Sequence, residues 1–215
     1  MNIWFASGNK NKKKELSAIL RTELKIPVDV GMEFDPEETG SSFHENALLK
    51  ARELYRMLSA RCPTGFKKGD PVIADDSGLC VDALGGRPGI YSALYAGSAV
   101  AFDNEKKLTG AQRNALLLEE LGANTVRSAR FVCAMVLLIS EDRFYIAQET
   151  MEGIIVASPQ FAKGSGGFGY DPVLYIPESG CTVAEMPDEE KNRISHRGKA
   201  GKIIADIIRE LNGNL

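Results

Sequence analysis

Apolar residues recur along the chain with two different periods, which predicts both strands and helices. Apolar runs bounded by turn residues predict strands, and such runs occupy residues 2–6, 26–32, 71–74, 127–140, 143–150 and 154–157. Apolar positions three or four residues apart predict helices, and these occupy residues 10–21, 43–61 and 104–121, followed by a last helix that Ser195 caps. Because helices join some strands and a short hairpin joins others, we predict an α/β fold with a mixed β-sheet and flanking helices.

The predicted strand at 71–74 leads directly into two adjacent carboxylates, Asp75 and Asp76. Ser77 and Gly78 follow, and glycine permits a tight turn, so we expect the strand to end there. Neighbouring acids at the end of a buried strand are costly to bury unless a cation, a proton or hydrogen-bond donors accompany them. These four residues alone fit a solvated acidic turn as well as they fit a ligand-binding site.

The 215 residues, 44% of them hydrophobic, suffice for one substantial core or two closely joined lobes. A net charge of −3 supplies no overall field that would attract a nucleic-acid polymer or an anionic membrane. The sequence has no apolar segment long enough to span a bilayer, and its N-terminus lacks the order of a signal peptide. Its cysteines form no CxxC pair, which argues against zinc and for reduced thiols in a cytoplasmic protein; they are Cys62, Cys80, Cys133 and Cys181.

A strand, a short glycine turn and a lysine-rich helix follow one another near the N-terminus. A helix that opens after such a turn favours an anion through its free N–H groups and its dipole. Lysines at positions 10, 12, 13 and 14 add positive charge, although the Walker A pattern GxxxxGK[ST] is absent. The helix dipole disfavours the alternative, a solvated cationic turn, so we predict an anion site after Ser7, Gly8 and Asn9.

The acidic loop before the second predicted helix contains Glu37 and Glu38. Ser42 and Glu45 fit a capping box, in which Ser42 is the N-cap and Glu45 is the third helical residue. Lys50 lies beside the apolar stripe of this helix and could reach a cleft. On its own, it would be interpreted as a solvated lysine.

Residues 164–169 match the letters GxGxxG, but we reject a dinucleotide site there. That fingerprint requires a helix that starts within the loop, whereas residues 170–176 predict a turn and a strand. The loop instead presents Phe168, Tyr170 and Asp171. An aromatic ring on a flexible loop can stack on a base while a carboxylate and backbone groups contact the base edge. The alternative is that Phe168 packs into the core.

Cationic side chains also surround the start of the last predicted helix. His196 and Arg197 occupy its first turn, and Lys191 precedes them closely. A single histidine at this position would usually be a surface residue. The combination with arginine and a nearby lysine is typical of a site for oxygen-rich groups.

Taken together, five blocks of residues resemble the inosine triphosphatase family, whose members hydrolyse deaminated purine nucleoside triphosphates. The blocks follow the family order and span nearly the whole chain. They are SGN at 7–9 with Lys12 and Glu15, EETG at 37–40 with Phe43, Glu45, Asn46, Ala47 and Lys50, ADDSGL at 74–79 with ALGG at 83–86 and PGIYSA at 88–93, GGFGYDP at 166–172, and SHRG at 195–198 with Ala200. Any single block is a weak match, but five in register are strong.

The resemblance implies an elongated α/β protein, with a single domain over residues 1–215 whose two lobes surround a central cleft, and usually a homodimer. It also implies hydrolysis of inosine, deoxyinosine and xanthosine triphosphates (ITP, dITP and XTP) to the monophosphate and pyrophosphate, with Mg²⁺ as cofactor. In the cytoplasm this reaction would keep deaminated purines out of DNA and RNA. The implied partners are small purine nucleoside triphosphates, with neither a nucleic-acid polymer nor a membrane.

The resemblance further implies a role for each matching residue. Asp76 would be the general base and a metal ligand, and Asp75 and Glu38 would help to hold Mg²⁺; Glu38 is preferred to Glu37 by motif register alone. Lys50 would be a charge partner of the phosphates, and Ser77 would touch the substrate. The other implied substrate-binding residues are Ser7, Gly8, Asn9, Lys10, Asn11 and Lys12 for the triphosphate, and Phe168, Gly169, Tyr170, Asp171, Lys191, His196 and Arg197 for the base and nearby sugar.

One position departs from the family pattern. The family commonly has an arginine where this chain has Leu94. The role of that arginine is therefore missing here or supplied by another residue, such as Arg87.

Two other hypotheses are open on the sequence alone. The first is a non-catalytic nucleotide sensor that uses the same cleft, and the second is a phosphohydrolase that cuts a different phosphate bond or acts on a modified pyrimidine nucleotide. The adjacent acids count against a sensor, because a site for a polyanion does not favour so many carboxylates unless a metal is held there. Identification of the products would separate the second hypothesis from a pyrophosphatase.

Overall fold

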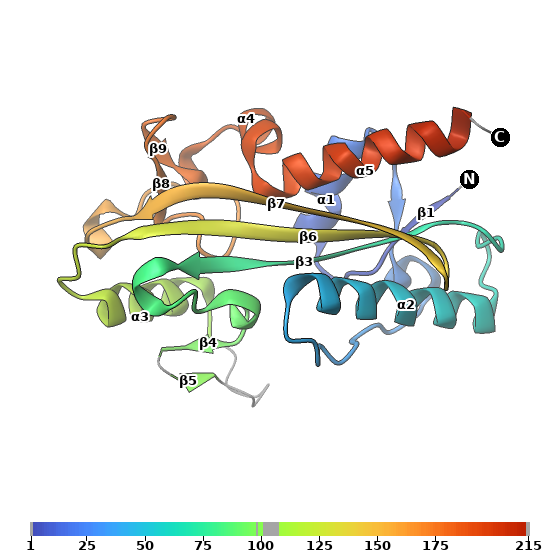
Figure 1. The fold of residues 1–215 in the computed structure, drawn as a ribbon, viewed down its shortest axis with the longest axis horizontal. Coiled ribbons are helices and arrows are strands. Elements are labelled where there is room, and N and C mark those ends of the chain that lie inside the picture. The colour runs from blue at the N-terminus through green and yellow to red at the C-terminus, as the bar shows by residue number, and fades with distance from the viewer. Residues whose placement is uncertain (1, 98, 101–107, 214–215) are drawn as a thin grey trace. The chain divides into compact units, whose positions relative to one another are not determined.

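The computed structural model describes residues 2–97, 99–100 and 108–213, and it has the predicted mixed α/β fold (Figure 1). Seven strands follow the order β2-β1-β3-β6-β7-β8-β9, and β4 and β5 form a separate two-stranded sheet. The strands are β1 (Ile3–Phe5), β2 (Leu24–Lys25), β3 (Val72–Val81), β4 (Tyr95–Ala96), β5 (Ala99–Val100), β6 (Ser128–Ser140), β7 (Arg143–Ile155), β8 (Leu174–Ile176) and β9 (Cys181–Thr182). The helices are α1 (Lys10–Leu20), α2 (Phe43–Arg61), α3 (Gly110–Leu121), α4 (Asp188–Ile194) and α5 (His196–Gly213). β1 pairs parallel with β2 and β3, whereas β8 pairs antiparallel with β7 and β9, so the sheet is mixed.

The chain divides into two compact units, each assembled from separate stretches of sequence. Unit 1 comprises residues 1–76, 133–149 and 196–215, and unit 2 comprises residues 77–132 and 150–195. The strands β3, β6 and β7 therefore each contribute residues to both units. The expectation of one domain with two lobes around a cleft stays a prediction.

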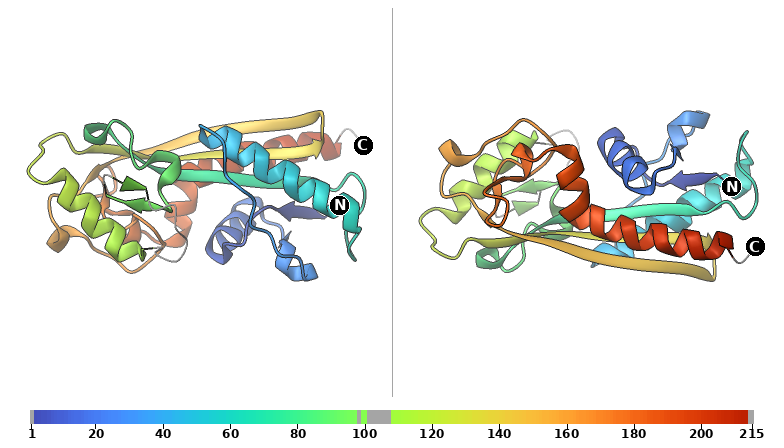
Figure 2. Two further views of the ribbon diagram at one scale, coloured as in Figure 1. Left: turned by 90° about the horizontal axis from the view of Figure 1, so that it is seen from below. Right: turned by 90° about the horizontal axis from the view of Figure 1, so that it is seen from above.

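In unit 1, helices cover both faces of the sheet (Figures 1 and 2). Successive residues of a strand point to opposite faces, and β1 shows this alternation. Ile3 and Phe5 pack with α1 and α5, whereas Trp4 and Ala6 pack with α2. In Figure 2 the view from below has α2 in front of the strands, and the view from above has α5 in front. A polar side chain on a strand of this unit thus meets one of two different sets of helices.

α1 and α5 approach each other closely on their face of the sheet. At Gly201 of α5, a Cβ would lie 2.8 Å from Ile19 Cγ2 and 3.3 Å from Leu16 Cδ1, so a larger residue would push the helices apart. The part of α5 around Gly201 is therefore held next to α1.

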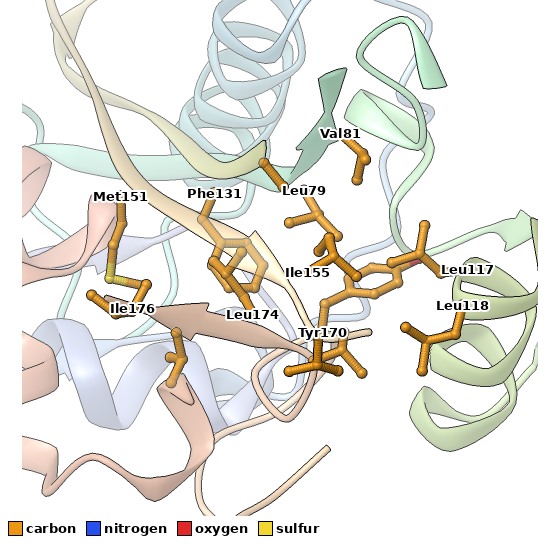
Figure 3. Close-up of a cluster of buried hydrophobic side chains, with 14 of the residues drawn as sticks. Leu79, Val81, Leu117, Leu118, Phe131, Met151, Ile155, Tyr170, Leu174 and Ile176 are labelled. Atoms are coloured by element: carbon orange, nitrogen blue, oxygen red, sulfur yellow. The ribbon is translucent and has the colours of Figure 1, made fainter. Parts of the chain in front are cut away.

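Unit 2 has an apolar core of its own, to which α3, β7 and β8 contribute. In Figure 3 the side chains of Leu117 and Ile155 lie next to the ring of Tyr170. The Tyr170 hydroxyl is buried and donates to the Ser92 carbonyl oxygen at 2.9 Å. This residue therefore anchors the chain just after the glycine-rich loop at residues 164–169.

The strand that carries the two neighbouring acids is longer than predicted. β3 continues past Ser77 and Gly78, so the turn predicted there is wrong. Leu79 and Val81 are fully buried, and the apolar alternation that they continue favours an extended strand over a turn. Both acids therefore lie in mid-strand, where each can face a different layer of helices.

The predicted strand at residues 26–32 is also wrong. β2 covers only Leu24–Lys25, and the next residues form a short 3₁₀ helix. Pro27 has no N–H to donate to a neighbouring strand, and the Asp29 carboxylate accepts from the Ile26 N–H at 3.0 Å. These two features favour a turn at residues where the apolar run predicts an extended strand.

Two further boundaries differ from the predictions. One continuous strand, β7, covers the segments 143–150 and 154–157 that the sequence separates, apart from the last two residues. α3 begins at Gly110 because Thr109 acts as its N-cap and accepts from the backbone N–H three residues on. The predicted helical residues 104–107 lie outside the described residues.

The remaining helix predictions are confirmed. α1 begins at Lys10, α2 covers the predicted residues, and α5 starts directly after Ser195. Within the described ranges, no helix combines the length and the apolar composition that a membrane crossing requires.

Candidate active site

Asp75 and Asp76 are neighbours on β3, and both are buried in unit 1, at 1% and 5% exposure. Since successive strand residues point to opposite faces, the two carboxylates meet different helices. Asp75 contacts α1 and α5, whereas Asp76 contacts α2. Each acid therefore has its own cationic partners.

The Asp75 carboxylate lies between two cations. Lys12 Nζ donates to it at 3.0 Å, and Arg197 donates through Nη2 at 3.0 Å and through Nε at 3.3 Å. Burial alone would raise the pKa of Asp75, but Lys12 and Arg197 outweigh burial and hold that pKa well below its ordinary value. At neutral pH, Asp75 is thus an anion that pairs with both cations beside it.

Glu15 completes this cluster, although the family resemblance assigns no role to it. Arg197 Nη1 donates to Glu15 Oε2 at 2.7 Å. Arg197, which the resemblance assigns to the base or sugar, is 2% exposed, and its guanidinium bonds to two carboxylates. One feature of the sequence could have placed Glu15 in this cluster. Lys12 and Glu15 are three residues apart and therefore lie on one face of α1.

The Asp76 carboxylate contacts Asn46 and Lys50, which lie one turn apart on α2. Lys50 Nζ donates to Asp76 Oδ1 at 2.9 Å, and Asn46 Nδ2 lies 3.4 Å from Asp76 Oδ2. Burial raises the pKa of Asp76, and the Lys50 ammonium offsets this effect only in part. Asp76 is therefore a better proton acceptor than an ordinary aspartate.

Lys50 connects Asp76 to the acidic loop. It is 7% exposed, so it is not a solvated lysine, and its Nζ lies 3.1 Å from Glu38 Oε1. Burial alone would lower the pKa of Lys50, but Asp76 and Glu38 outweigh burial and raise that pKa. One ammonium is thus shared by two carboxylates, and this contact supports the choice of Glu38 over Glu37.

The acidic loop is fixed to α2 at Gly40. The Gly40 N–H donates to Asn46 Oδ1 at 2.8 Å, and a Cβ at Gly40 would lie 2.6 Å from the same oxygen. Ser42 caps α2 as predicted, but the backbone N–H that donates to the Glu45 carboxylate is that of Ser41, the residue before the cap. A glycine is therefore required where the loop meets the helix, and Asn46 joins this loop to Asp76.

The first turn of α1 is capped by Asn9. Asn9 Oδ1 accepts from the N–H groups of Asn11 and Lys12 at 2.9 and 3.2 Å, and Ser7 Oγ accepts from the Asn9 N–H at 3.1 Å. The expectation of free N–H groups for an anion is therefore wrong for Asn11 and Lys12, because the cap already uses them. A Cβ at Gly8 would meet no atom within 4 Å, so the turn has open space beside it.

In unit 2, a second group of predicted residues comes together at the glycine-rich loop. Asp171 and Lys191 form a buried ion pair at 2.9 Å. The Phe168 N–H donates to Asp171 Oδ2 at 2.8 Å, and Lys191 Nζ lies 5.2 Å from the centroid of the Phe168 ring. Phe168 is half-buried beside this ammonium and not packed into the core. Gly167 has no room for a side chain, because a Cβ there would lie 1.9 Å from Asp171 Oδ2.

Four other residues from the sequence analysis lie elsewhere. The Tyr170 ring is committed to the core of unit 2, which does not leave it free to contact a base. His196, the first residue of α5, is buried, unlike the surface residue that a lone histidine suggests. Ser77 is half-buried in β3. Arg87 donates to Glu120 at 2.6 Å, so it already serves an ion pair of unit 2.

Among the residues that the structure describes, no three histidine, cysteine, aspartate or glutamate side chains converge closely enough to hold a metal ion. Glu38 and Asp76 do converge on one ammonium. Mg²⁺ is commonly held by one or two carboxylates together with phosphates and water, so this pair fits such an ion. Asp75 faces the other side of β3, where Lys12 and Arg197 bind its oxygens.

Comparison with known protein families matches residues 3–207 to the Ham1 family. The chain belongs to the Ham1 family. It is 49% identical to the dITP/XTP pyrophosphatase of Treponema denticola, over 97% of this chain and 99% of that protein, and 45% identical to the dITP/XTP pyrophosphatase of Geobacillus kaustophilus, over 92% and 89%. Among solved structures it is similar to the Ham1 protein of Staphylococcus aureus (TM-score 0.79, 35% identity, 98% of this chain and 99% of that chain) and to a HAM1 protein from Coxiella burnetii (TM-score 0.80, 37% identity, 98% and 99%). The mixed α/β fold and the family resemblance are thereby confirmed.

Replacement of Asp75 is expected to destabilise this Ham1 protein in a pH-dependent way. At neutral pH, Asp75→Asn should lower the free energy of unfolding by about 3–5 kcal/mol, because the buried Arg197 loses a carboxylate partner. Folding lowers the pKa of Asp75 below its ordinary value of 3.8. Its ionised form therefore stabilises the fold above about pH 4, and this contribution is lost as the pH falls below that value.

The measurement is urea unfolding of wild type and variant between about pH 7 and about pH 3, without divalent metal. Below about pH 4, wild type should lose stability more steeply than Asp75→Asn, by up to about 1.4 kcal/mol per pH unit. The exposed Asp35→Asn serves as the control, with an expected change below about 0.5 kcal/mol. Parallel curves for wild type and Asp75→Asn would contradict the account of Asp75.

Proposed function

We propose that this Ham1 protein hydrolyses deaminated purine nucleoside triphosphates, namely ITP, dITP and XTP, to the monophosphate and pyrophosphate. Its relatives in Treponema denticola and Geobacillus kaustophilus bear the name dITP/XTP pyrophosphatase. The observation that carries the proposal is the convergence of Glu38, Lys50 and Asp76, which puts a buried base beside a cation and a second acid. Dependence on Mg²⁺, a homodimeric state and a cytoplasmic location belong to the same proposal. The reaction would remove deaminated nucleotides before a polymerase incorporates them.

Asp76 is the proposed general base. Its raised pKa favours acceptance of a proton from the attacking water, and its contacts with Lys50 and Asn46 orient the carboxylate. The raised pKa of Lys50 keeps that side chain cationic beside the reacting phosphate. Attack of water at the α-phosphorus then releases pyrophosphate, while the positive charge of Lys50 stabilises the charge that develops on the phosphate oxygens.

The start of α1 is the proposed site of the phosphates. Lys10 and Asn11 are exposed on the first turn, and the absence of a side chain at Gly8 leaves space beside them. The positive end of the helix dipole adds to the attraction of the lysines for an anion. Lys12 connects this turn to Asp75 and so fixes the turn to β3.

Glu38 and Asp76 are the residues that would hold the proposed Mg²⁺. When bound, the ion would neutralise phosphate charge and make phosphorus more open to attack. The shared Lys50 ammonium supports this assignment, because the two carboxylates are already arranged around a positive charge. For Asp75 we propose a narrower role than the resemblance implies, which is to hold Lys12 and Arg197 in place.

Phe168, Asp171 and Lys191 are the proposed base-binding residues. An aromatic ring can stack on a purine, and a carboxylate can accept from the N1–H of hypoxanthine or xanthine. Adenine has an acceptor at N1 and a donor at its 6-position, so a site built for a 6-keto edge would leave polar groups unpaired with ATP. Guanine shares the 6-keto edge, so GTP would be rejected at its 2-amino group.

Removal of the proposed base should slow turnover strongly without abolishing nucleotide binding. We expect Asp76→Asn to hydrolyse ITP about 10²- to 10⁴-fold more slowly than wild type, because general base catalysis is worth that much. Nucleotide affinity, measured by calorimetric titration with ITP, should stay within about tenfold of wild type, because the amide keeps the shape of the side chain. Wild type should prefer ITP to both ATP and GTP.

Asp35→Asn is the matched control, since it makes the same chemical change at an exposed position and should leave turnover unaltered. Equal hydrolysis of ATP and ITP by wild type would contradict the proposed specificity. Wild-type turnover by Asp76→Asn would contradict the assignment of the base.

The acidic loop allows a separate test of the metal assignment. Glu38→Gln should raise the Mg²⁺ concentration required for half-maximal activity by at least about tenfold, because it removes a carboxylate from the proposed pair. Glu37→Gln, the neighbouring matched variant, should need the same Mg²⁺ concentration as wild type. The reverse order of effects would transfer the metal role to Glu37.

A further inference from the structure

The glycine-rich loop of unit 2 is attached on one side through backbone groups. The Gly166 N–H donates to the Ala184 carbonyl at 3.1 Å, and the Ala184 N–H donates to the Asp171 carbonyl at 3.2 Å. The approach is so close that a Cβ at Gly164 would lie 2.3 Å from the Ala184 carbonyl carbon. On this side, the position of the loop is therefore set by main-chain contacts.

On its other side the loop faces α3, and a side chain makes the hydrogen bond there. Asn114 Nδ2 donates to the Gly169 carbonyl at 3.2 Å. Gly110, one turn earlier on the same face of α3, also approaches Gly169, since a Cβ at Gly110 would lie 3.5 Å from that carbonyl oxygen. Two residues of α3 thus meet the same peptide group of the loop.

An open pocket adjoins this contact. A cavity of about 340 Å³ lies between α3 and the loop, and Asn114, Phe168 and Gly169 are among the residues that line it. Asn114 is 9% exposed, and its Oδ1 has no hydrogen-bond partner among the described residues. Because a cavity lies next to the loop, packing constrains Gly169 less than it constrains a core residue. The position of Gly169 therefore depends more strongly on the hydrogen bond from the Asn114 amide.

Gly169 links the hydrogen bond from Asn114 to the proposed base-binding residues Phe168, Asp171 and Lys191. It has a φ of +66°, a conformation that favours glycine, and it follows Phe168 directly. On its other side, Tyr170 is fixed in the core and hydrogen-bonded to Ser92. Gly169 therefore connects Tyr170, whose position is fixed, to Phe168, whose N–H donates to Asp171.

We propose that Asn114 is a positioning residue for base recognition, and this inference rests on the proposed function. Its amide holds the Gly169 carbonyl and thereby sets the position of Phe168 relative to Asp171. Asn114 does not touch the substrate in this account. Its removal should weaken recognition of the base and leave the chemistry at the phosphates unchanged.

The test compares wild type with Asn114→Asp and Asn114→Ala in steady-state hydrolysis of ITP and ATP. Asn114→Asp keeps the shape of the side chain but replaces the donor by an oxygen that repels the Gly169 carbonyl. We expect the KM for ITP to rise on the order of tenfold in both variants, in line with the loss of one buried hydrogen bond. The kcat should stay within about twofold of wild type. The preference for ITP over ATP should fall, because the proposed base-binding residues favour ITP and not ATP.

Leu121→Ala is the control for general destabilisation. Leu121 is a buried residue at the far end of α3, so its truncation should lower the melting temperature without a change in KM or in base preference. If Asn114→Asp does not fold, Asn114→Ala decides the question, because it removes the donor without adding a charge.

Wild-type KM and base preference in a folded Asn114 variant would overturn the inference, as would an equal rise in KM for Leu121→Ala. These outcomes differ from failure of the proposed function. If wild type does not hydrolyse ITP at all, the proposed function and this inference fall together. If wild type hydrolyses ITP and the Asn114 variants match it, only the inference is lost.

Discussion

The burial of two neighbouring carboxylates on one strand is the constraint on which the candidate site depends. Because β3 stays extended through Asp75 and Asp76, the two side chains point to opposite faces of the sheet. A buried carboxylate is tolerated only when a cation or donors accompany it. The fold therefore supplies Lys12 and Arg197 on one face and Lys50 on the other.

This arrangement gives two chemically identical residues different properties. Asp75 is held between two cations, so its pKa falls and its charge is fixed. Asp76 has one ammonium, which it shares with Glu38, and burial keeps its pKa raised. Two carboxylates whose environments push their pKa values apart are suited to different tasks. Asp75 holds α1 and α5 beside β3 through Lys12 and Arg197, and Asp76 is the residue that we propose for proton transfer and metal binding.

Local sequence signals predicted much of the fold, but they did not predict contacts between residues far apart in the chain. α2 starts and ends as predicted, since its cap and its apolar period are both local. The family resemblance predicted the candidate site residues but not their pairing, because Arg197 and Asp75 meet although they are 122 positions apart in the chain. The predicted turn at Ser77 also concealed the strand alternation that separates the two acids. Asn46 and Gly40 were missed as a pair because a glycine and an asparagine are common in any loop.

The central claim is that water attacks the α-phosphorus of a deaminated purine nucleotide and releases pyrophosphate. The most direct test is hydrolysis of ITP by the wild-type protein in ¹⁸O-labelled water with Mg²⁺, followed by mass spectrometry of the products. The account predicts unlabelled pyrophosphate and inosine monophosphate that carries one ¹⁸O atom. Labelled orthophosphate together with inosine diphosphate, or label in the pyrophosphate, would contradict it.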